Sequence, residues 1–441
     1  MEKTTSVSLP PLPKGREFEE YISAYFQSSG NYIERNIIEK GAEEVLELDI
    51  IATDYYLPLP KIKLLEVKSG DWGFPDLFKV KGWMDYLNIS EGVFVASKGR
   101  ENLDFCRERV KRLNIDLVII ANLNKTKEAL SNFIDDKTIE KVDISAWRFS
   151  YWIERNLLKL LKQKKRANHN TYIKRFEVLD DYYSEINNGI FLTENIIQKV
   201  EKLYSTFQKY PHISAKCGNE LLGNTFDDEC DTVPKQIFQD TYFKCYYNDI
   251  QISTFIEHRA RLAILKNAVD YLLYSDAATD KVRTNDVIKN TLGLNISLLD
   301  SFPSFKNVLK TISKQKYFYL YPVFWQWFMW VFGGFILKDY EEKEYEMLSQ
   351  KTGIPVEEIP NAFEAYRILF PQDDGWFIDL PTSNIKVLKM FSVPFMGVGA
   401  NYRRLIYNRF KKLEDLKLTG LHTLDDLVKW NNLTVDVLQS G

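Results

Sequence analysis

Residues 45–53 (VLELDIIAT) and 61–68 (KIKLLEVK) are two short apolar runs that carry charged residues in their middle. Short segments rich in Ile, Leu and Val between turn-like residues are typical of β-strands, so both runs are predicted to be strands. Asp49 lies in the first strand, and Glu66 and Lys68 lie in the second. Charge within an apolar strand is costly unless it is paired or bound to a metal, so these three residues are candidates for a site.

The spacing of these residues predicts which of them share a face of the sheet. Successive side chains of a strand alternate between the two faces, so Glu66 and Lys68 share one face and Val67 points into the core on the other. If the two strands form a hairpin, Asp49 lies across from Glu66 on the charged face. A pair of the Glu-x-Lys type is also common on solvated sheet surfaces, so the pattern alone leaves that alternative open.

The surrounding segments complete an α/β unit. The pattern predicts further strands over 31–39, 92–97 and 115–121, and helices over 15–28, 75–88 and 100–113. The order is therefore α-β-β-β-α-β, followed by an added α-β. Alternation of helices and strands at the end of the unit predicts parallel strands joined by crossover helices.

Two carboxylates beside a lysine suit the hydrolysis of a phosphodiester bond. That reaction needs a divalent metal to neutralise charge on the phosphoryl oxygens, an activated water and a fixed phosphate. Hard cations such as Mg²⁺ prefer carboxylate and carbonyl oxygens. Asp49, Glu66 and Lys68 supply two such ligands and a cation that could orient the water.

The order of these motifs resembles the PD-(D/E)XK nuclease superfamily, the restriction-endonuclease-like group that includes Mrr-type enzymes, Holliday-junction resolvases and phage-defence nucleases. GREFEE at residues 15–20 is similar to the Gly-x-x-Phe-Glu opening helix of the Mrr and resolvase groups. The resemblance covers about residues 15–121 of the 441. Mrr proteins usually carry Gln where Glu66 stands, so this chain departs from their pattern.

The resemblance implies a metal-dependent deoxyribonuclease. Asp49, Glu66 and the carbonyl of Val67 would hold one or two Mg²⁺ or Mn²⁺ ions, and Glu19 in the opening helix would be an additional ligand. Lys68 would position or polarise the attacking water, and the products would carry 5′-phosphate and 3′-hydroxyl ends. Glu20 adjoins Glu19, so a solvated helix residue is the alternative for either of them.

Three functional alternatives follow from this resemblance. The first is a DNA endonuclease that acts in restriction or antiviral defence. The second is a catalytically inactive interaction protein built on a nuclease fold, and the third is a nuclease directed at RNA.

The rest of the chain is expected to be mainly helical. The expected organisation is a flexible arm at 1–14, a nuclease domain at 15–146, a basic helical linker at 147–176 and a recognition or regulatory domain at 177–441, with a subdomain break near 340–380. The last domain is expected to bind a target or a protein partner, and a homodimer is also considered. The candidate DNA-contacting residues are Lys79, Lys81, Lys162, Lys164, Lys165 and Arg166, with ordinary surface cations as the alternative.

Net charge and cysteine content indicate which partners and which cellular compartment to expect. The net charge of −3 shows that a nucleic-acid partner would need a local basic face. The four cysteines form no CxxC pair, which favours reduced thiols and a cytoplasmic protein. A zinc site formed by Cys217, Cys230 and Cys245 with His212 or His258 is disfavoured because the spacings lack short chelating loops.

Two later segments invite other interpretations. Residues 317–337 (YFYLYPVFWQWFMWVFGGFIL) are long enough to span a membrane, but Pro322, two glycines and many Trp and Tyr side chains favour a buried helix. We therefore expect no membrane contact. Residues 348–359 (LSQKTGIPVEEI) are similar to a helix-turn-helix, although Pro360 is expected to interrupt the second helix.

Overall fold

The computed structural model describes residues 9–40, 42–57, 59–135, 138–165, 183–188, 247–279, 303–369, 377–379, 385–388 and 394–407. Everything below refers to these residues.

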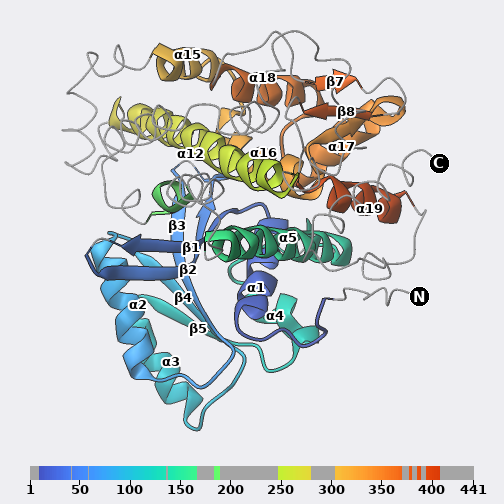
Figure 1. The fold of residues 1–441 in the computed structure, drawn as a ribbon. Helices are drawn as coiled ribbons and strands as arrows, with labels where there is room; N and C mark the ends of the chain where they lie inside the picture. The colour runs from blue at the N-terminus through green and yellow to red at the C-terminus, as the bar shows by residue number, and fades with distance from the viewer. Residues whose placement is uncertain are drawn as a thin grey trace, which may run out of the picture.

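A five-stranded mixed sheet forms the N-terminal half of the described chain (Figure 1). Its strands are β1 (Tyr32–Lys40), β2 (Glu44–Asp54), β3 (Lys61–Lys68), β4 (Glu91–Ala96) and β5 (Ile115–Ile119), in that spatial order. The pairs β1–β2 and β2–β3 are antiparallel, whereas β3–β4 and β4–β5 are parallel. The five predicted strands and the parallel crossovers are confirmed.

Helices cover both faces of this sheet. They are α1 (Arg16–Ser28), α2 (Phe74–Tyr86), α3 (Leu103–Lys111), α4 (Thr126–Leu130) and α5 (Lys141–Lys165). Helices α2 and α3 pack on one face, where Val80 and Val110 share a core with Phe94 of β4. Helices α1 and α5 pack on the other face, which Val67 joins from β3. The α/β core is thus confirmed, with each predicted helix present.

The pairing of β1 with β2 is irregular at two points, a register shift between Glu39 and Lys40 and a gap beside Asp49. Arg35 pairs with Ile50 and Ile37 pairs with Leu48, so the ladder skips Asn36 and the residue opposite it, Asp49. Asn36 has φ of 51°, a left-handed conformation that is uncommon in a strand. Leu48 faces the α2 side of the sheet, whereas Ile50 faces the α1 side. Distortions of this kind re-aim a side chain, and here that side chain is Asp49.

The described C-terminal region is mainly helical, as expected. It contains α12 (Tyr247–Thr279), α15 (Pro303–Ile312), α16 (Tyr321–Gln326), α17 (Glu341–Thr352), α18 (Ile359–Leu369) and α19 (Met396–Ile406). A small antiparallel sheet of β6 (Phe335–Leu337), β8 (Ile385–Leu388) and β7 (Phe377–Asp379) was not anticipated.

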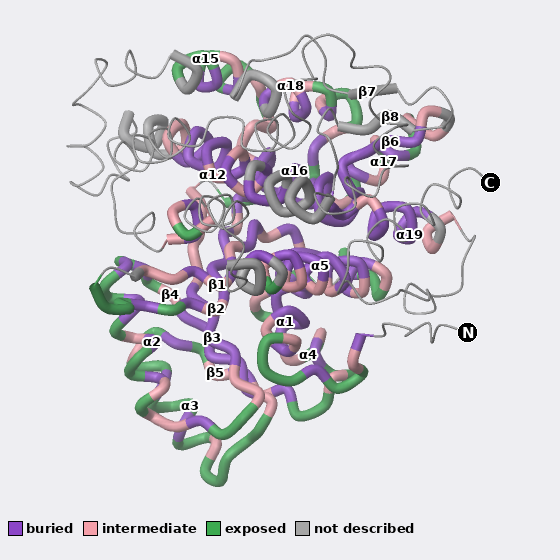
Figure 2. Tube along the Cα trace, in the orientation of Figure 1, coloured by how far each residue is buried: buried purple, intermediate pink, exposed green. Residues whose placement is uncertain are grey.

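One apolar core runs from the sheet into this helical region. Trp147, Ile153 and Leu157 of α5 are buried in it, together with residues of α1 and α12. Figure 2 shows α5 largely buried, whereas the outer sides of α2 and α3 are exposed. Every residue of α16 is buried as well. Residues 147–165 of the predicted linker are therefore helical, with buried side chains as far along as Leu161, and the proposed division into domains stays a prediction.

The aromatic run at 317–337 is buried inside the protein from residue 320 onward, and its first three residues are partly buried. It forms a 3₁₀ turn (Phe318–Leu320), α16, a π-helical turn (Trp327–Val331) and β6. Gln326 connects this run to β1. Its side chain accepts a hydrogen bond from the Ile33 N–H at 3.0 Å and donates one to the Ile33 carbonyl at 2.6 Å. Among the described residues no helix has the length and apolar character needed to cross a membrane.

The segment after α17 corrects one expectation. Helix α17 ends at Thr352, and Gly353 follows with φ of 73°. Pro360 is the second residue of α18, where the missing N–H costs nothing, so the prediction that it interrupts this helix was wrong. Ile354 and Ile359 are buried, which gives this turn a role in packing.

Candidate functional site

Asp49 lies where β2 and β3 separate. The β2–β3 ladder ends at the pair Ile50–Leu65. Beyond it, the Val67 N–H donates to Asp49 Oδ2 at 2.9 Å, so the carboxylate takes the place of a strand partner. Within a strand, the N–H and C=O of one residue point to the same side. The carbonyl of Val67 therefore points toward Asp49.

Glu66 and Lys68 share a face of β3, as the alternation predicted. Lys68 Nζ lies 2.7 Å from Glu66 Oε1, and the two side chains are 32% and 3% exposed. Val67 is buried in the opposite core. A carboxylate this deeply buried needs compensation, which a single ion pair to a half-exposed lysine supplies only in part.

Helix α1 brings Glu19 to the same cluster. The helix begins beside the end of β3, because the Gly15 N–H donates to Ser69 Oγ at 2.7 Å. Burial raises the pKa of Glu19, although the charge of Arg35 opposes this effect. The charges of Glu66 and Lys68 also act on Glu19, which places it near both.

The neighbouring Glu20 has a different environment. It is buried and forms an ion pair with Arg155 of α5, Nε to Oε1, at 3.3 Å. Burial raises the pKa of Glu20 to about 7, against the charges of Arg35 and Arg155. Glu20 therefore attaches α1 to α5, whereas Glu19 belongs to the candidate site.

The electrostatics of this cluster are unbalanced. Burial raises the pKa of Asp49 to about 8, and the charges of Glu66 and Glu19 add to this effect. The hydrogen bond from the Val67 N–H acts in the opposite direction. Burial alone would lower the pKa of Lys68, but its hydrogen bond to Glu66 and the charges of Glu66, Asp49 and Asp76 together outweigh burial and raise it. Three carboxylates thus surround one lysine, and an added cation would relieve their repulsion.

The oxygen donors suit a hard cation. Mg²⁺ is usually bound through one or two carboxylates, retained waters and substrate phosphates. Asp49 and Glu66 provide two carboxylates, and the Val67 carbonyl points to the same place. No group of three or more His, Cys, Asp and Glu side chains among the described residues could hold a metal alone. A metal at this cluster would therefore need further oxygen ligands, such as the Val67 carbonyl and retained waters.

The remaining sequence candidates have other surroundings. Lys79 Nζ lies 4.2 Å from the centre of the Trp83 ring, and Lys81 pairs with Asp85, so both contact their own helix α2. Lys162, Lys164 and Lys165 belong to α5, but their side chains lie outside the described residues, as does Arg166. The cysteines Cys217, Cys230 and Cys245 also lie outside them.

Asp76 is a site neighbour that the sequence interpretation missed. It lies in the first turn of α2, accepts from the Gly73 N–H at 2.8 Å, and its charge helps to raise the pKa of Lys68. A carboxylate three residues after the N-cap glycine is a usual feature of a helix start, so this signal was available.

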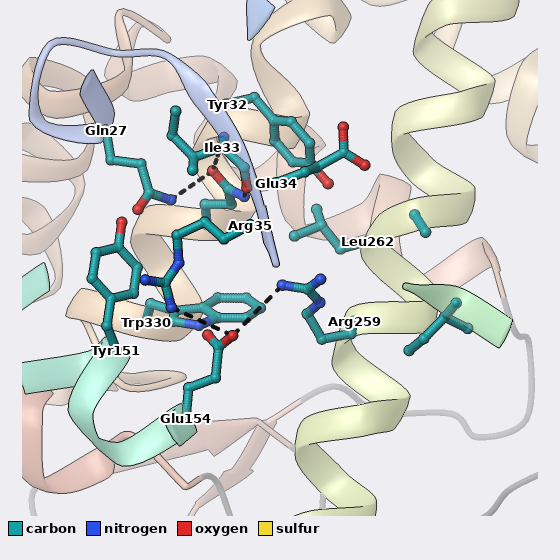
Figure 3. A pocket seen from close by; sticks show the side chains of 13 residues that line it. Gln27, Tyr32, Ile33, Glu34, Arg35, Tyr151, Glu154, Arg259, Leu262 and Trp330 are labelled. Carbon is teal, nitrogen blue, oxygen red and sulfur yellow. Dashed lines mark hydrogen bonds and ion pairs between the residues drawn. The ribbon is translucent and has the colours of Figure 1, made fainter. Parts of the chain in front are cut away.

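A separate polar cavity lies between β1, α5 and α12 (Figure 3). Arg35 and Arg259 approach the same Glu154 Oε1 atom, at 3.5 and 4.0 Å. The cavity volume is about 30 Å³, enough for a water molecule. Gln27 Oε1 and the Tyr151 hydroxyl have no hydrogen-bond partner among the described residues, and a water would satisfy them. This cavity lies between packed elements and is too small to hold a substrate.

Fold and site together define an α/β protein with an acid–lysine cluster at the ends of adjacent strands. Comparisons with models of protein families, with curated proteins and with solved structures found no match for this chain.

Proposed function

We propose that this chain is a metal-dependent nuclease of the PD-(D/E)XK type that hydrolyses phosphodiester bonds in DNA. The observation that supports it most is the cluster of Asp49, Glu66 and Lys68 where β2 and β3 separate. Glu19 joins this cluster from the opening helix, in agreement with the resemblance of GREFEE to that of related nucleases. The proposal includes a role in restriction or antiviral defence.

Each residue of the cluster has a role in this proposal. Asp49, Glu66 and the Val67 carbonyl would hold Mg²⁺ or Mn²⁺, with Glu19 as a further ligand or a water acceptor. The bound ion would neutralise charge on the phosphoryl oxygens. Lys68 would orient the attacking water or stabilise the developing charge. The Val67 N–H fixes the Asp49 carboxylate in advance, which reduces the cost of ordering it.

A non-catalytic interaction protein with this fold is the second candidate. It is favoured by one observation, namely that no three acidic, histidine or cysteine side chains among the described residues could hold a metal by themselves. An RNA-directed nuclease is a variant of the first proposal. Metal binding separates the first two candidates, and substrate choice separates DNA from RNA.

The decisive experiment combines metal titration with cleavage. The purified full chain is titrated calorimetrically with Mg²⁺ and Mn²⁺, and then incubated with plasmid, linear and single-stranded DNA and with matched RNA. We expect metal-dependent cleavage of DNA that EDTA stops. Full activity in EDTA would contradict the proposed metal chemistry, and cleavage of RNA alone would assign the RNA alternative. Absence of both metal binding and cleavage would support the interaction protein.

A further inference from the structure

Two exposed phenylalanines occupy the outer surface of α2 and α3. Phe78 is 60% exposed and Phe105 is 51% exposed. Phe74 lies between them, with ring centroids 6.4 Å from each. Figure 2 shows exposed stretches on the outer sides of these two helices. Single exposed apolar residues are ordinary, but a cluster of large rings marks a binding surface. We call Phe74, Phe78 and Phe105 the aromatic platform.

Two arginines adjoin the aromatic platform. The guanidinium of Arg109 lies over the Phe105 ring, 5.1 Å from its centre. The guanidinium of Arg100 lies 5.3 Å from the centre of the Trp72 ring, beside the Gly73 that precedes α2. Neither arginine forms an ion pair with a carboxylate of the described residues, whereas Arg107 and Arg112 on the same surface do. Arg100 and Arg109 therefore offer charge that the fold leaves uncompensated.

The aromatic platform begins at the same edge of the sheet as the candidate site. Strands β3 and β4 are parallel, so their carboxyl ends lie together, and α2 and α3 begin there. Ser69, directly after Lys68, accepts a hydrogen bond at its carbonyl from Ser97 Oγ at 3.0 Å. The charge of Asp76 contributes to the raised pKa of Lys68, so the two side chains are near each other. Asp76 lies in the first turn of α2, which also contains Phe74.

We propose that the aromatic platform binds unpaired nucleotides of the substrate strand, with bases stacked on Phe78 and Phe105 and phosphates at Arg100 and Arg109. Bases can stack on protein rings only where they are not already stacked in a duplex, so the platform selects single-stranded segments. This inference deepens the proposed nuclease function and rests on it. It assigns as substrate a nucleic acid with an unpaired segment next to the scissile phosphate.

A second copy of the chain would fit this surface less well. In a two-fold symmetric dimer the same patch meets itself, which would bring Arg100 and Arg109 of both copies together. Like charges facing each other across an interface are unfavourable. A strand of phosphates instead complements both arginines.

The test measures binding in the absence of metal, where no cleavage occurs. The full chain is titrated against a labelled single strand of about 12 nucleotides and against its duplex, with fluorescence anisotropy as the readout. Phe78→Ala combined with Phe105→Ala should weaken binding of the single strand about 25-fold or more, because each base–aromatic stack contributes at least a fivefold factor. Duplex binding and the melting temperature of the protein should not change.

Variants of the two arginines should change the salt dependence of binding. Arg100→Gln and Arg109→Gln should each flatten the slope of log K against log salt by about 0.7 for the single strand. The phenylalanine variants should leave that slope unchanged. The matched controls are Tyr86→Ala, which removes a 50% exposed ring at the other end of α2, and Arg112→Gln, which removes an arginine paired with Glu108.

The outcomes separate this inference from the proposed function. Unchanged binding in the phenylalanine double variant, or equal losses on single strand and duplex, would overturn the platform. Neither result would contradict the proposed cleavage of DNA at the cluster that contains Lys68. Loss of a dimer in sedimentation, without loss of nucleic-acid binding, would assign the surface to a second copy instead. Selective loss of single-strand binding in a protein that never cleaves would support the platform and contradict the nuclease.

Discussion

Two groups of buried charge in this protein differ in how completely they are compensated. Arg403 of α19 and Glu344 of α17 are 1% and 0% exposed and pair through Nη2 and Oε2 at 2.6 Å. The guanidinium also donates to the carbonyls of Phe332, Phe335 and Gly399. At the candidate site, by contrast, one lysine faces the carboxylates of Asp49, Glu66 and Glu19.

The difference indicates what each group is for. A buried pair with balanced charge and satisfied hydrogen bonds can hold helices in place without any ligand. A cluster with excess negative charge destabilises the protein until a cation arrives, so selection for stability alone does not explain it. Variants at the two groups should therefore change stability in opposite directions, and only the candidate site should affect cleavage.

The largest expected effect is on cleavage by the acidic variants. Asp49→Asn and Glu66→Gln each replace a charged oxygen ligand by a neutral one, so Mg²⁺-dependent cleavage should be abolished. Calorimetric titration should show weaker metal binding in both variants, and Ca²⁺ should support DNA binding without cleavage. Glu91→Gln, at the exposed pair of Glu91 with Lys61, is the control and should cleave normally. Retained cleavage in Asp49→Asn would remove this carboxylate from the mechanism.

The next effect is on stability at the balanced pair. Arg403→Met leaves Glu344 buried without its cation and should lower the free energy of unfolding by about 3–5 kcal/mol. Urea denaturation of the wild type and the variant measures this change. The double variant Arg403→Met with Glu344→Leu should recover most of the loss, because no charge is then left buried. A small loss in the single variant would mean that the pair is not the determinant of packing between α17 and α19.

The third effect concerns Lys68, the lysine proposed to be catalytic. Lys68→Ala should reduce cleavage about 100-fold or more while folding and DNA binding stay nearly intact, because it removes an interaction made in the transition state. Lys61→Ala is a matched control on the same strand, since Lys61 Nζ also lies 2.7 Å from a glutamate oxygen but is 42% exposed. Cleavage at the wild-type rate in Lys68→Ala would exclude the lysine from the reaction.

The fourth effect is a pH dependence of stability without metal. The folded pKa of Asp49, about 8, exceeds its unfolded value of 3.8. The stability that the protonated carboxyl contributes is therefore fully present below about pH 4 and is lost as the pH rises through 8. The melting temperature of Asp49→Asn should exceed that of the wild type by an amount that grows across this range.

Scanning calorimetry in EDTA provides this comparison. Adding Mg²⁺ at pH 8 should stabilise the wild type more than Asp49→Asn, because a ligand stabilises the form that binds it. Parallel profiles of the two proteins from pH 4 to pH 8 would contradict the raised pKa of Asp49.

The sequence predicted the sheet and the acid–lysine cluster because both depend on local pattern. Alternation along residues 61–68 determines that Glu66 and Lys68 share a face, and apolar runs locate the other strands. The distortion at Asn36 was missed because a left-handed residue within a strand has no strong local signature. The roles of Glu19 and Glu20 could not be separated either, since they depend on Arg155, which is remote in sequence. The β6–β8 pairing was missed because it joins short segments far apart in the chain.

The smallest expected effect concerns a third set of charges, the cations of residues 162–166 at the end of α5 and directly after it. Arg155, nearer the middle of this helix, is compensated by Glu17 and Glu20, so it resembles the balanced pair. The side chains of Lys162, Lys164, Lys165 and Arg166 lie outside the described residues, and we propose that they contact the phosphates of DNA. Replacing these four by Gln should weaken binding to all sequences alike and flatten the slope of log K against log salt by about 0.9 per lost contact on duplex DNA. Lys310→Gln, at an exposed lysine of α15, is the control. An unchanged slope would identify the end of α5 as an ordinary solvated surface, and the contrast between compensated and uncompensated charge would then apply to the candidate site alone.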